Sequence, residues 1–352
     1  RASARSGCND SAKNTECAKG VSQMDVQAAQ LLRERTSLAL DWLEADLVEI
    51  KEAAHTPVTV ILPALNEEAT VATIVRQIRR ELMAPHGPNL VDELVVLDSG
   101  STDRTAKVAA DAGATVIHRD DVLPALPTVP GKGEAMWRGV AATAGELVVF
   151  IDADLRSFST SYVVGLIGPL LTDPKVQLVK AVYERPLVGD RQVMPAGGGR
   201  VTELVARPLL NLHWPELAGV IQPLAGEYAA RRSLLEQLPF SYGYGVDFAL
   251  LIDTATKYGV RAIAQVDLGV RVHRHHDTSR LGRMAAEIMQ TAWSRLAPAN
   301  GLSPTIGQSL TQFERDADGY HSSSHEVPIL ERPPLNTIAE YVATTTSNPS
   351  PR

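Results

Sequence analysis

Two carboxylates, Asp152 and Asp154, stand two residues apart directly after the apolar run Leu147–Ile151. Carboxylate oxygens fixed at the end of a parallel strand are suitable ligands for a divalent cation that binds a diphosphate. An isolated Asp-x-Asp pair is common and usually forms a solvated turn, so the segments around the pair decide its meaning. With those segments it predicts a metal site. Asp154 is the expected direct ligand, whereas Asp152 could bind a ribose or a metal-bound water.

A polar turn, PALNEE at residues 63–68, follows the apolar run Val58–Leu62 and opens a helix. A strand-to-helix turn at the carboxyl edge of a sheet is a natural rim for a ligand. Glu67 could bind a ribose or a base there, with the backbone of Ala64 and Leu65 beside the base. The alternative is simple helix capping by the asparagine of the turn, with acidic residues in the first helical turn.

Two further segments could contact a nucleotide. LDSGSTD at residues 97–103 either forms a capped turn or places Asp98 and Ser99 on the nucleotide. PGKGE at residues 130–134 presents Lys132 between two glycines, where its ammonium could approach a phosphate closely or simply be solvated. This loop is not a P-loop, because the GxxxxGK[ST] pattern is missing.

The downstream segments suit an anion, a sugar and a third metal ligand. GGGRVT at residues 197–202 combines bare backbone, a guanidinium and a hydroxyl at a helix start, which favours anion binding over a plain glycine hinge. PLAGEY (223–228) and YGYGVD (242–247) offer carboxylates and aromatic hydroxyls, although either could be a plain turn. In GVRVHRHH (269–276) a neutral imidazole could ligate a metal, and His273 is the best placed. Arg271 could reach a diphosphate or form a surface ion pair.

These segments must be positioned by alternating strands and helices, which predict an α/β fold with a doubly wound, mostly parallel sheet. The expected strands are Val58–Leu62, Glu93–Leu97, Thr115–Ile117, Leu147–Ile151, Gln177–Tyr183, Ala262–Val266 and Gly269–Val272. The expected helices are Glu67–Arg80, Arg104–Ala112, Ala135–Ala142, Arg200–Leu210 and Leu281–Trp293.

The chain divides into five expected parts: a disordered tail (1–20), a helical segment (21–56), a nucleotide-sugar-binding half (57–190), an acceptor-binding half (191–297) and an irregular, loosely packed extension (298–352). At 352 residues, 44% of them hydrophobic, the chain can bury one large core. A net charge of −7 argues against general nucleic-acid binding. The only cysteines, Cys8 and Cys17, lie in the tail, and no apolar run could span a membrane, so a cytoplasmic location is expected.

In order, the segments ILPALNEE, LDSGSTD, PGKGE, DAD, GGGRVTELVARPLL, QPLAGEYAARR, YGYGVD and LGVRVHR resemble the retaining glucosyl-3-phosphoglycerate synthases of actinobacteria and their mannosyl-3-phosphoglycerate synthase relatives. The resemblance runs from Val58 to His275. GGGRVTELVARPLL is its most specific part, because inverting sugar transferases share only the ALNEE, DSGSTD and Asp-x-Asp pieces.

The resemblance implies a GT-A fold, a homodimer, and Mg²⁺ (or Mn²⁺) as cofactor. It implies transfer of glucose from UDP-glucose to the 2-hydroxyl of 3-phosphoglycerate with retained configuration. The motifs then predict a nucleotide-sugar site at Pro63, Ala64, Leu65, Glu67, Ser99, Lys132, Asp152, Ala153, Asp154, Leu224 and Tyr244. They predict an acceptor site at Gly199, Arg200, Val201, Thr202 and His275, a metal held by Asp154 and His273, and catalytic roles for Asp154, Lys132, Asp247 and Arg271.

The chain departs from the family pattern at several positions. Asp247 stands where the family has Glu, and His275 where it often has Asn, while DAD and PLAGEY replace DSD and PLSGEY. These changes leave open GDP-mannose as an alternative donor. A family 2-like transferase acting on a lipid phosphate is a further alternative, but it usually carries hydrophobic anchors. A nucleotidyltransferase would need a GxGTRxxP loop, which is absent, and a non-catalytic relative would not be expected to keep the metal pair.

Overall fold

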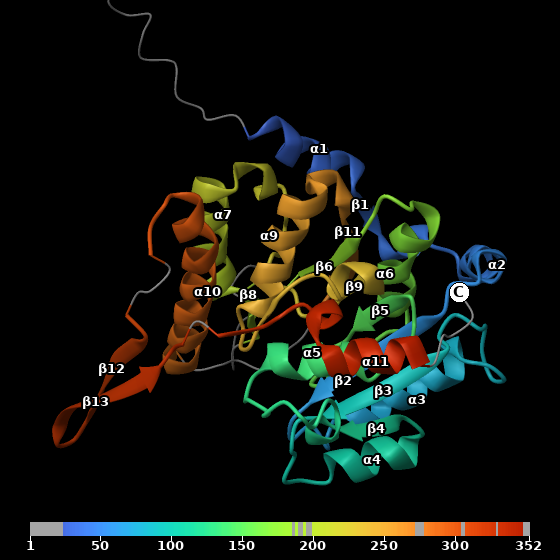
Figure 1. Ribbon diagram of the computed structural model, residues 1–352, viewed down its shortest axis with the longest axis horizontal. Helices are drawn as coiled ribbons and strands as arrows, with labels where there is room; N and C mark the ends of the chain where they lie inside the picture. Colours follow the sequence, from blue (N-terminus) through green and yellow to red (C-terminus); the bar gives the residue numbers. More distant parts are fainter. Residues whose placement is uncertain are drawn as a thin grey trace, which may run out of the picture.

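The structure is a computed structural model that describes residues 24–184, 187–188, 193–194, 199–271, 278–303, 307–328 and 330–347. An eight-stranded sheet crosses the molecule in the order β1-β11-β6-β9-β5-β2-β3-β4 (Figure 1). All neighbours are parallel except β9, which is antiparallel to both β5 and β6. The strands are β1 (Thr36–Leu38), β2 (Val58–Ala64), β3 (Glu93–Asp98), β4 (Thr115–His118), β5 (Leu147–Phe150), β6 (Leu178–Glu184), β9 (Tyr228–Arg231) and β11 (Ile263–Val270).

Helices cover both faces of the sheet, because the buried strands present apolar side chains alternately to either side. On β2, Val60 and Leu62 pack into the cluster under one set of helices, whereas Ile61 packs into the cluster under the other. The first set is α3 (Val71–Leu82), α4 (Thr105–Ala112) and α6 (Ser161–Thr172); the second includes α5 (Lys132–Ala141) and α9 (Val246–Tyr258). This arrangement confirms the predicted α/β fold.

The N-terminal segment forms α1 (Val26–Glu34) and α2 (Glu44–Ala54), with β1 between them at the edge of the sheet. The sequence indicated the helices but not the strand. The expected disordered tail, residues 1–20, lies outside the described residues.

Three regions differ in detail from the predicted elements. The strands expected at 262–266 and 269–272 are one strand, β11, whose register against β6 shifts between Asp267 and Val270. The expected helix at 200–210 begins with a π-helical turn, η3 (Thr202–Ala206), and continues as α7 (Arg207–His213). Helix α10 (Thr278–Ala299) is longer than predicted at both ends.

The C-terminal extension is more regular than the sequence indicated. Strands β12 (Ser309–Asp316) and β13 (Gly319–Glu326) form a hairpin that projects from the body (Figure 1). Beyond it, β14 (Glu331–Arg332) pairs with β10 (Phe240–Ser241), and α11 (Ala339–Ser347) follows. The extension is anchored by three buried apolar side chains, Val327, Leu335 and Tyr341. Anchors this sparse leave no periodic signal in a Pro-, Ser- and Thr-rich sequence.

In the part of the chain that the structure describes, no helix combines the length and apolar character needed to cross a bilayer.

Candidate active site

A pocket of about 1160 Å³ opens at the carboxyl ends of β2, β3 and β5. Its walls contain every predicted site residue that the structure describes, namely Pro63, Ala64, Leu65, Glu67, Ser99, Lys132, Asp152, Ala153, Asp154, Gly199, Arg200, Val201, Thr202, Leu224, Tyr244, Asp247 and Arg271. His273 and His275 lie outside the described residues. The structure therefore brings eight separate segments of the sequence around one cavity.

The turn after β2 is locked to the turn after β3. Asn66 adopts a left-handed backbone conformation, with φ of 60°, and its side-chain oxygen accepts a hydrogen bond from the backbone N–H of Thr102 at 2.8 Å. The backbone N–H of Glu67 donates to the Thr105 hydroxyl at 2.7 Å. Asn66 is thus not the cap of α3, which begins four residues after Glu67, and the capping interpretation is wrong. The two turns form one rigid rim beside Ser99.

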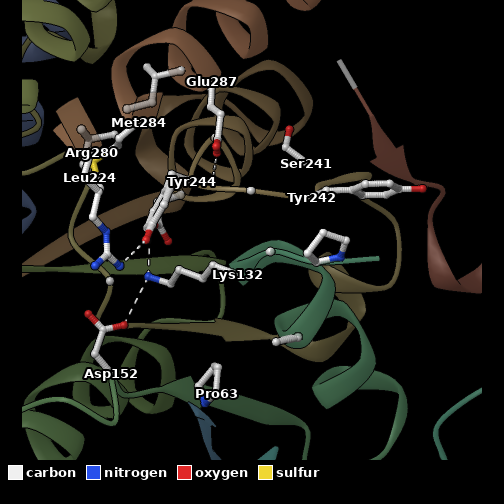
Figure 2. A pocket seen from close by; sticks show the side chains of 18 of the residues that line it. Pro63, Lys132, Asp152, Leu224, Ser241, Tyr242, Tyr244, Arg280, Met284 and Glu287 are labelled. Carbon is white, nitrogen blue, oxygen red and sulfur yellow. Dashed lines mark hydrogen bonds and ion pairs between the residues drawn. The ribbon is translucent and has the colours of Figure 1, made fainter. Parts of the chain in front are cut away.

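Lys132 is the first residue of α5 and forms the centre of the pocket's charge cluster. Its Nζ lies 3.3 Å from Asp152 Oδ1 and 3.2 Å from Asp247 Oδ2 (Figure 2). Burial alone would lower the pKa of Lys132, but the Asp152 and Asp247 carboxylates raise it well above its ordinary value. The ammonium is therefore charged at every physiological pH.

Arg271 joins the Asp-x-Asp pair to a buried carboxylate. Its Nη2 lies 3.1 Å from Asp152 Oδ2 and 3.6 Å from Asp154 Oδ1, and its Nη1 lies 2.7 Å from Glu227 Oε2 and from the Tyr183 hydroxyl. The side chain is 7% exposed, so the alternative of a surface ion pair is wrong. Burial would raise the pKa of Asp152, but Lys132 and Arg271 hold it below its usual range.

Glu227 and Lys180 are also parts of this cluster; our sequence reasoning noted Glu227 only as the carboxylate of the PLAGEY turn and did not select Lys180. Glu227 is completely buried, which raises the pKa of its carboxyl, and it precedes the antiparallel strand β9. Lys180 lies inside β6, and burial lowers its pKa to about 8. Its Nζ donates to the Ala225 carbonyl at 2.7 Å. A lysine in the apolar run LVKAVY was the available signal.

Gly226 explains how the 223–228 turn reaches the charge cluster. A Cβ atom on this residue would lie 2.4 Å from Asp152 Oδ2 and 2.7 Å from Lys132 Nζ. Only glycine allows the backbone to approach both groups this closely. Any larger residue would displace the pair of charges that the pocket holds together.

The charge cluster suits a divalent cation. Its four carboxylates face three cations, and Glu227 Oε1 and Asp247 Oδ1 are buried without a hydrogen-bond partner among the described residues. Excess carboxylate oxygen at the end of β5 is the donor set that Mg²⁺ and Mn²⁺ prefer. Within the described ranges no three His, Cys, Asp or Glu side chains form a complete ligand group, so Asp154 needs a further ligand, for which His273 stays a prediction.

The remaining walls combine the 199–202 turn with α10. Gly199 has φ of 77°, and the Glu203 N–H donates to its carbonyl at 3.0 Å, which turns the Arg200 backbone into the pocket's edge. Opposite, Arg280 Nη2 donates to the Tyr244 hydroxyl at 3.0 Å, and the Tyr244 N–H donates to Glu287 Oε2 at 2.6 Å (Figure 2). Arg280 and Glu287 sit in an amphipathic helix, so no sequence signal distinguished them.

Comparison with known proteins agrees with this geometry. The family model for glycosyl transferase family 2 matches residues 59–238. The glucosyl-3-phosphoglycerate synthase of Mycobacterium tuberculosis (strain ATCC 25618 / H37Rv) is 48% identical over 303 residues, which cover 84% of this chain and 90% of that protein. The enzyme of the same name from Petrotoga mobilis (strain DSM 10674 / SJ95) is 41% identical over 298 residues, covering 84% of this chain and 91% of that protein.

Solved structures give the same result. The Mycobacterium tuberculosis synthase in complex with Mg²⁺ and UDP is 46% identical with a TM-score of 0.76, covering 86% of this chain and 98% of that chain. The mannosyl-3-phosphoglycerate synthase of Rubrobacter xylanophilus is 37% identical with a TM-score of 0.81, covering 90% of this chain and 99% of that chain. The chain is therefore a glycosyltransferase with the GT-A fold, and it belongs to the family of glucosyl-3-phosphoglycerate synthases and their mannosyl relatives.

Proposed function

We propose that this protein transfers glucose from UDP-glucose to the 2-hydroxyl of 3-phosphoglycerate, with retention of configuration, giving glucosyl-3-phosphoglycerate. The observation that carries the proposal is that Lys132, bound to Asp152 and Asp247, lines the same pocket as the nucleotide rim and the Arg200 turn. A complex of the mycobacterial relative holds UDP-glucose, phosphoglyceric acid and Mn²⁺, which supports the same substrates here.

Each wall of the pocket has a proposed task. The rim from Pro63 to Glu67, with Ser99, binds the nucleotide, and Gly199 to Thr202 bind the phosphate and carboxylate of the acceptor. Lys132 neutralises charge that develops on the leaving diphosphate. Asp247 accepts hydrogen bonds from sugar hydroxyls through its unpaired Oδ1. Tyr244 and Leu224 complete the sugar pocket.

A divalent cation held by Asp154, and by His273 in our proposal, would supply Lewis-acid stabilisation of the leaving diphosphate. No carboxylate is an evident covalent nucleophile, because Asp152, Glu227 and Asp247 each bind Lys132 or Arg271. We therefore propose attack by the acceptor hydroxyl on the face that the diphosphate leaves. The leaving phosphate oxygen takes the hydroxyl proton in this scheme.

Transfer of mannose from GDP-mannose is the second candidate. It is favoured by the mannosyl-3-phosphoglycerate synthase with a TM-score of 0.81 and by Asp247, whose carboxylate is one methylene shorter than the Glu of the family pattern. Transfer to a lipid phosphate has no comparable support.

The test is a matrix of UDP- and GDP-linked glucose and mannose, with and without 3-phosphoglycerate and Mg²⁺, in which nucleotide release and the glycosylated product are measured. We expect product only with acceptor and metal, and most of it with UDP-glucose. The anomeric configuration and the linkage position follow from NMR of the product. Release without acceptor, or transfer from GDP-mannose alone, would overturn the first proposal.

We also propose a homodimer, which size-exclusion chromatography with light scattering would test. The cytoplasmic location and the division into a nucleotide-sugar-binding half and an acceptor-binding half stay predictions.

A further inference from the structure

We propose that Arg332, in the C-terminal extension, is a positioning residue that holds Lys132 in its place between Asp152 and Asp247. The proposal rests on the function proposed above for Lys132. It gives the extension a role in the reaction, although Arg332 itself does not line the pocket.

Arg332 holds the first turn of α5 through a buried carboxylate. Its Nε lies 2.6 Å from Glu134 Oε2 and its Nη2 lies 2.8 Å from Glu134 Oε1, so the pair is bidentate. Glu134 is completely buried and stands two residues after Lys132. A bidentate guanidinium fixes both the position and the plane of a carboxylate. Arg332 therefore fixes the turn that carries Lys132.

The same carboxylate controls the loop that leads into α5. Glu134 Oε1 also accepts from Arg138 Nε at 2.6 Å. Arg138 donates onward to the carbonyls of Val122, Leu123, Leu126 and Pro127, and Arg332 donates to the Pro127 carbonyl as well. Two guanidiniums that share one buried carboxylate thus close the loop from 122 to 131 onto the helix.

Aromatic contacts connect this clamp to the pocket wall. The Arg332 guanidinium lies 5.2 Å from the centre of the Trp137 ring and 5.3 Å from that of the Tyr242 ring. Tyr242 lines the pocket (Figure 2), and its carbonyl accepts from the Glu134 N–H at 3.2 Å. The Trp137 indole donates to the Pro333 carbonyl at 3.0 Å. The extension, α5 and the pocket wall are one connected unit.

The glycines beside Lys132 fit this unit closely. A Cβ atom on Gly131 would lie 2.2 Å from the Tyr242 carbonyl oxygen, and one on Gly133 would lie 1.7 Å from the Ser241 carbonyl oxygen. The backbone on either side of Lys132 is therefore pressed against the segment that pairs with β14. Since a displacement of 1 Å can cost about a hundredfold in rate, a loosened clamp should reduce turnover.

A double-mutant cycle tests the proposal. We expect Arg332→Ala to lower kcat about ten- to a hundredfold, with the KM for 3-phosphoglycerate changed less than about twofold. In a Lys132→Met background the same change should have little further effect on kcat, because Arg332 acts through Lys132. Arg332→Lys should restore part of the activity. Arg315→Ala is the matched control, since Arg315 stacks on Tyr320 at 5.5 Å in the projecting hairpin and should leave kcat unchanged.

The proposal would be overturned if Arg332→Ala lowered kcat equally in the wild-type and the Lys132→Met proteins. It would also be overturned if Arg332→Ala lowered the melting temperature but left kcat at the wild-type value. If Arg332→Ala does not fold, the cycle is run with Arg332→Lys. If the wild-type protein transfers no sugar, the proposed function is wrong. The positioning role of Arg332 is then still tested by UDP binding in the presence of Mg²⁺, measured by calorimetry. Arg332→Ala should still weaken UDP binding, because it displaces Lys132. If Arg332→Ala leaves UDP affinity unchanged both with Lys132 and with Lys132→Met, Arg332 does not position Lys132.

Discussion

At the scale of single residues, Asp154 is the site residue whose replacement should affect the reaction most and the stability of the fold least. It follows β5 at the sheet edge, and its side chain is 35% exposed, whereas Asp152 and Asp247 are paired with Lys132. We expect Asp154→Ala to abolish metal-dependent transfer and to leave the melting temperature in EDTA within about 1 °C, because the side chain is partly exposed and Arg271 keeps its closer contacts to Asp152 and Glu227. Mn²⁺ binding in the presence of UDP, measured by electron paramagnetic resonance, should be lost in parallel. Undiminished Mn²⁺ affinity would remove Asp154 from the metal site.

Arg200 provides the matching prediction for the acceptor. It is exposed and lines the pocket beside Gly199, where an anionic ligand could contact its guanidinium. A charge-assisted contact is worth roughly 1.5–3 kcal/mol, so Arg200→Ala should raise the KM for 3-phosphoglycerate about ten- to a hundredfold. The KM for the nucleotide-sugar should stay nearly constant. Initial rates with each substrate varied in turn measure both, and an equal rise in both would move Arg200 away from the acceptor.

The sequence predicted which residues line the pocket better than it predicted their contacts. The turns after β2, β3 and β5 were predictable because each follows an apolar run of the right length. For Arg271 the sequence left two interpretations open, a contact with the diphosphate and a surface ion pair. Its partners Glu227 and Tyr183 are distant in the sequence, so no local pattern indicated them. The Arg332–Glu134 pair spans 198 residues, so neither periodicity nor a local motif indicates it.

At the scale of elements, two strands of the eight-stranded sheet, β1 and β9, were not predicted, and both for the same reason. Strand β9 lies between β5 and β6, and β1 pairs with β11, so each owes its pairing to a distant segment. Both are short, and local patterns carry little information about non-local pairing. Helix α3 was placed four residues too early because the turn before it bonds to the 101–105 segment, and the helix begins only at Val71.

Packing of the N-terminal segment on α6 gives an element-scale prediction. A Cβ atom on Gly168 would lie 2.2 Å from Cδ2 of Trp42, whose indole donates to Ser37 at 3.1 Å. Gly168→Ala should therefore destabilise the protein by about 1–3 kcal/mol through overpacking. In a Trp42→Ala background the same change should stabilise it by about 0.5–1 kcal/mol, because alanine favours the helix. Urea unfolding of the four proteins measures both, and the same sign in the two backgrounds would contradict the packing argument.

At the scale of the whole molecule, both ends of the described chain complete the domain. Near the start of the described chain, β1 extends the sheet at one edge. Near its end, β14 pairs with β10, which follows β9 and α8 after the turn that carries Glu227. Leu335 and Tyr341 bury their side chains in the cluster that contains Trp137. The core around α5 therefore includes residues near the end of the described chain, and removal of α11 should lower the stability of the protein.

The contribution of α11 to stability can be measured from the pH dependence of unfolding, because α11 carries Tyr341. Its hydroxyl donates to Glu236 Oε1 at 2.6 Å, and burial, followed by this hydrogen bond, raises its pKa to about 12. The folded protein holds the phenol proton more tightly than the unfolded chain, whose tyrosine pKa is about 10. The resulting contribution is complete below pH 10 and is lost as the pH rises from about 10 through about 12.

We therefore expect the free energy of unfolding of Tyr341→Phe to fall less steeply than that of the wild type above pH 10. By pH 11.5 the difference should reach about 1–2 kcal/mol, because the full value of a two-unit shift is lost only above about pH 12. At pH 8 the variant should be less stable by roughly 1.5–3 kcal/mol, since it lacks the hydrogen bond to Glu236. Urea unfolding between pH 8 and pH 11.5 measures both terms. Tyr320→Phe, at an exposed position of the hairpin, is the control and should follow the wild-type slope. Parallel curves for Tyr341→Phe and the wild type would mean that α11 is not held through this phenol.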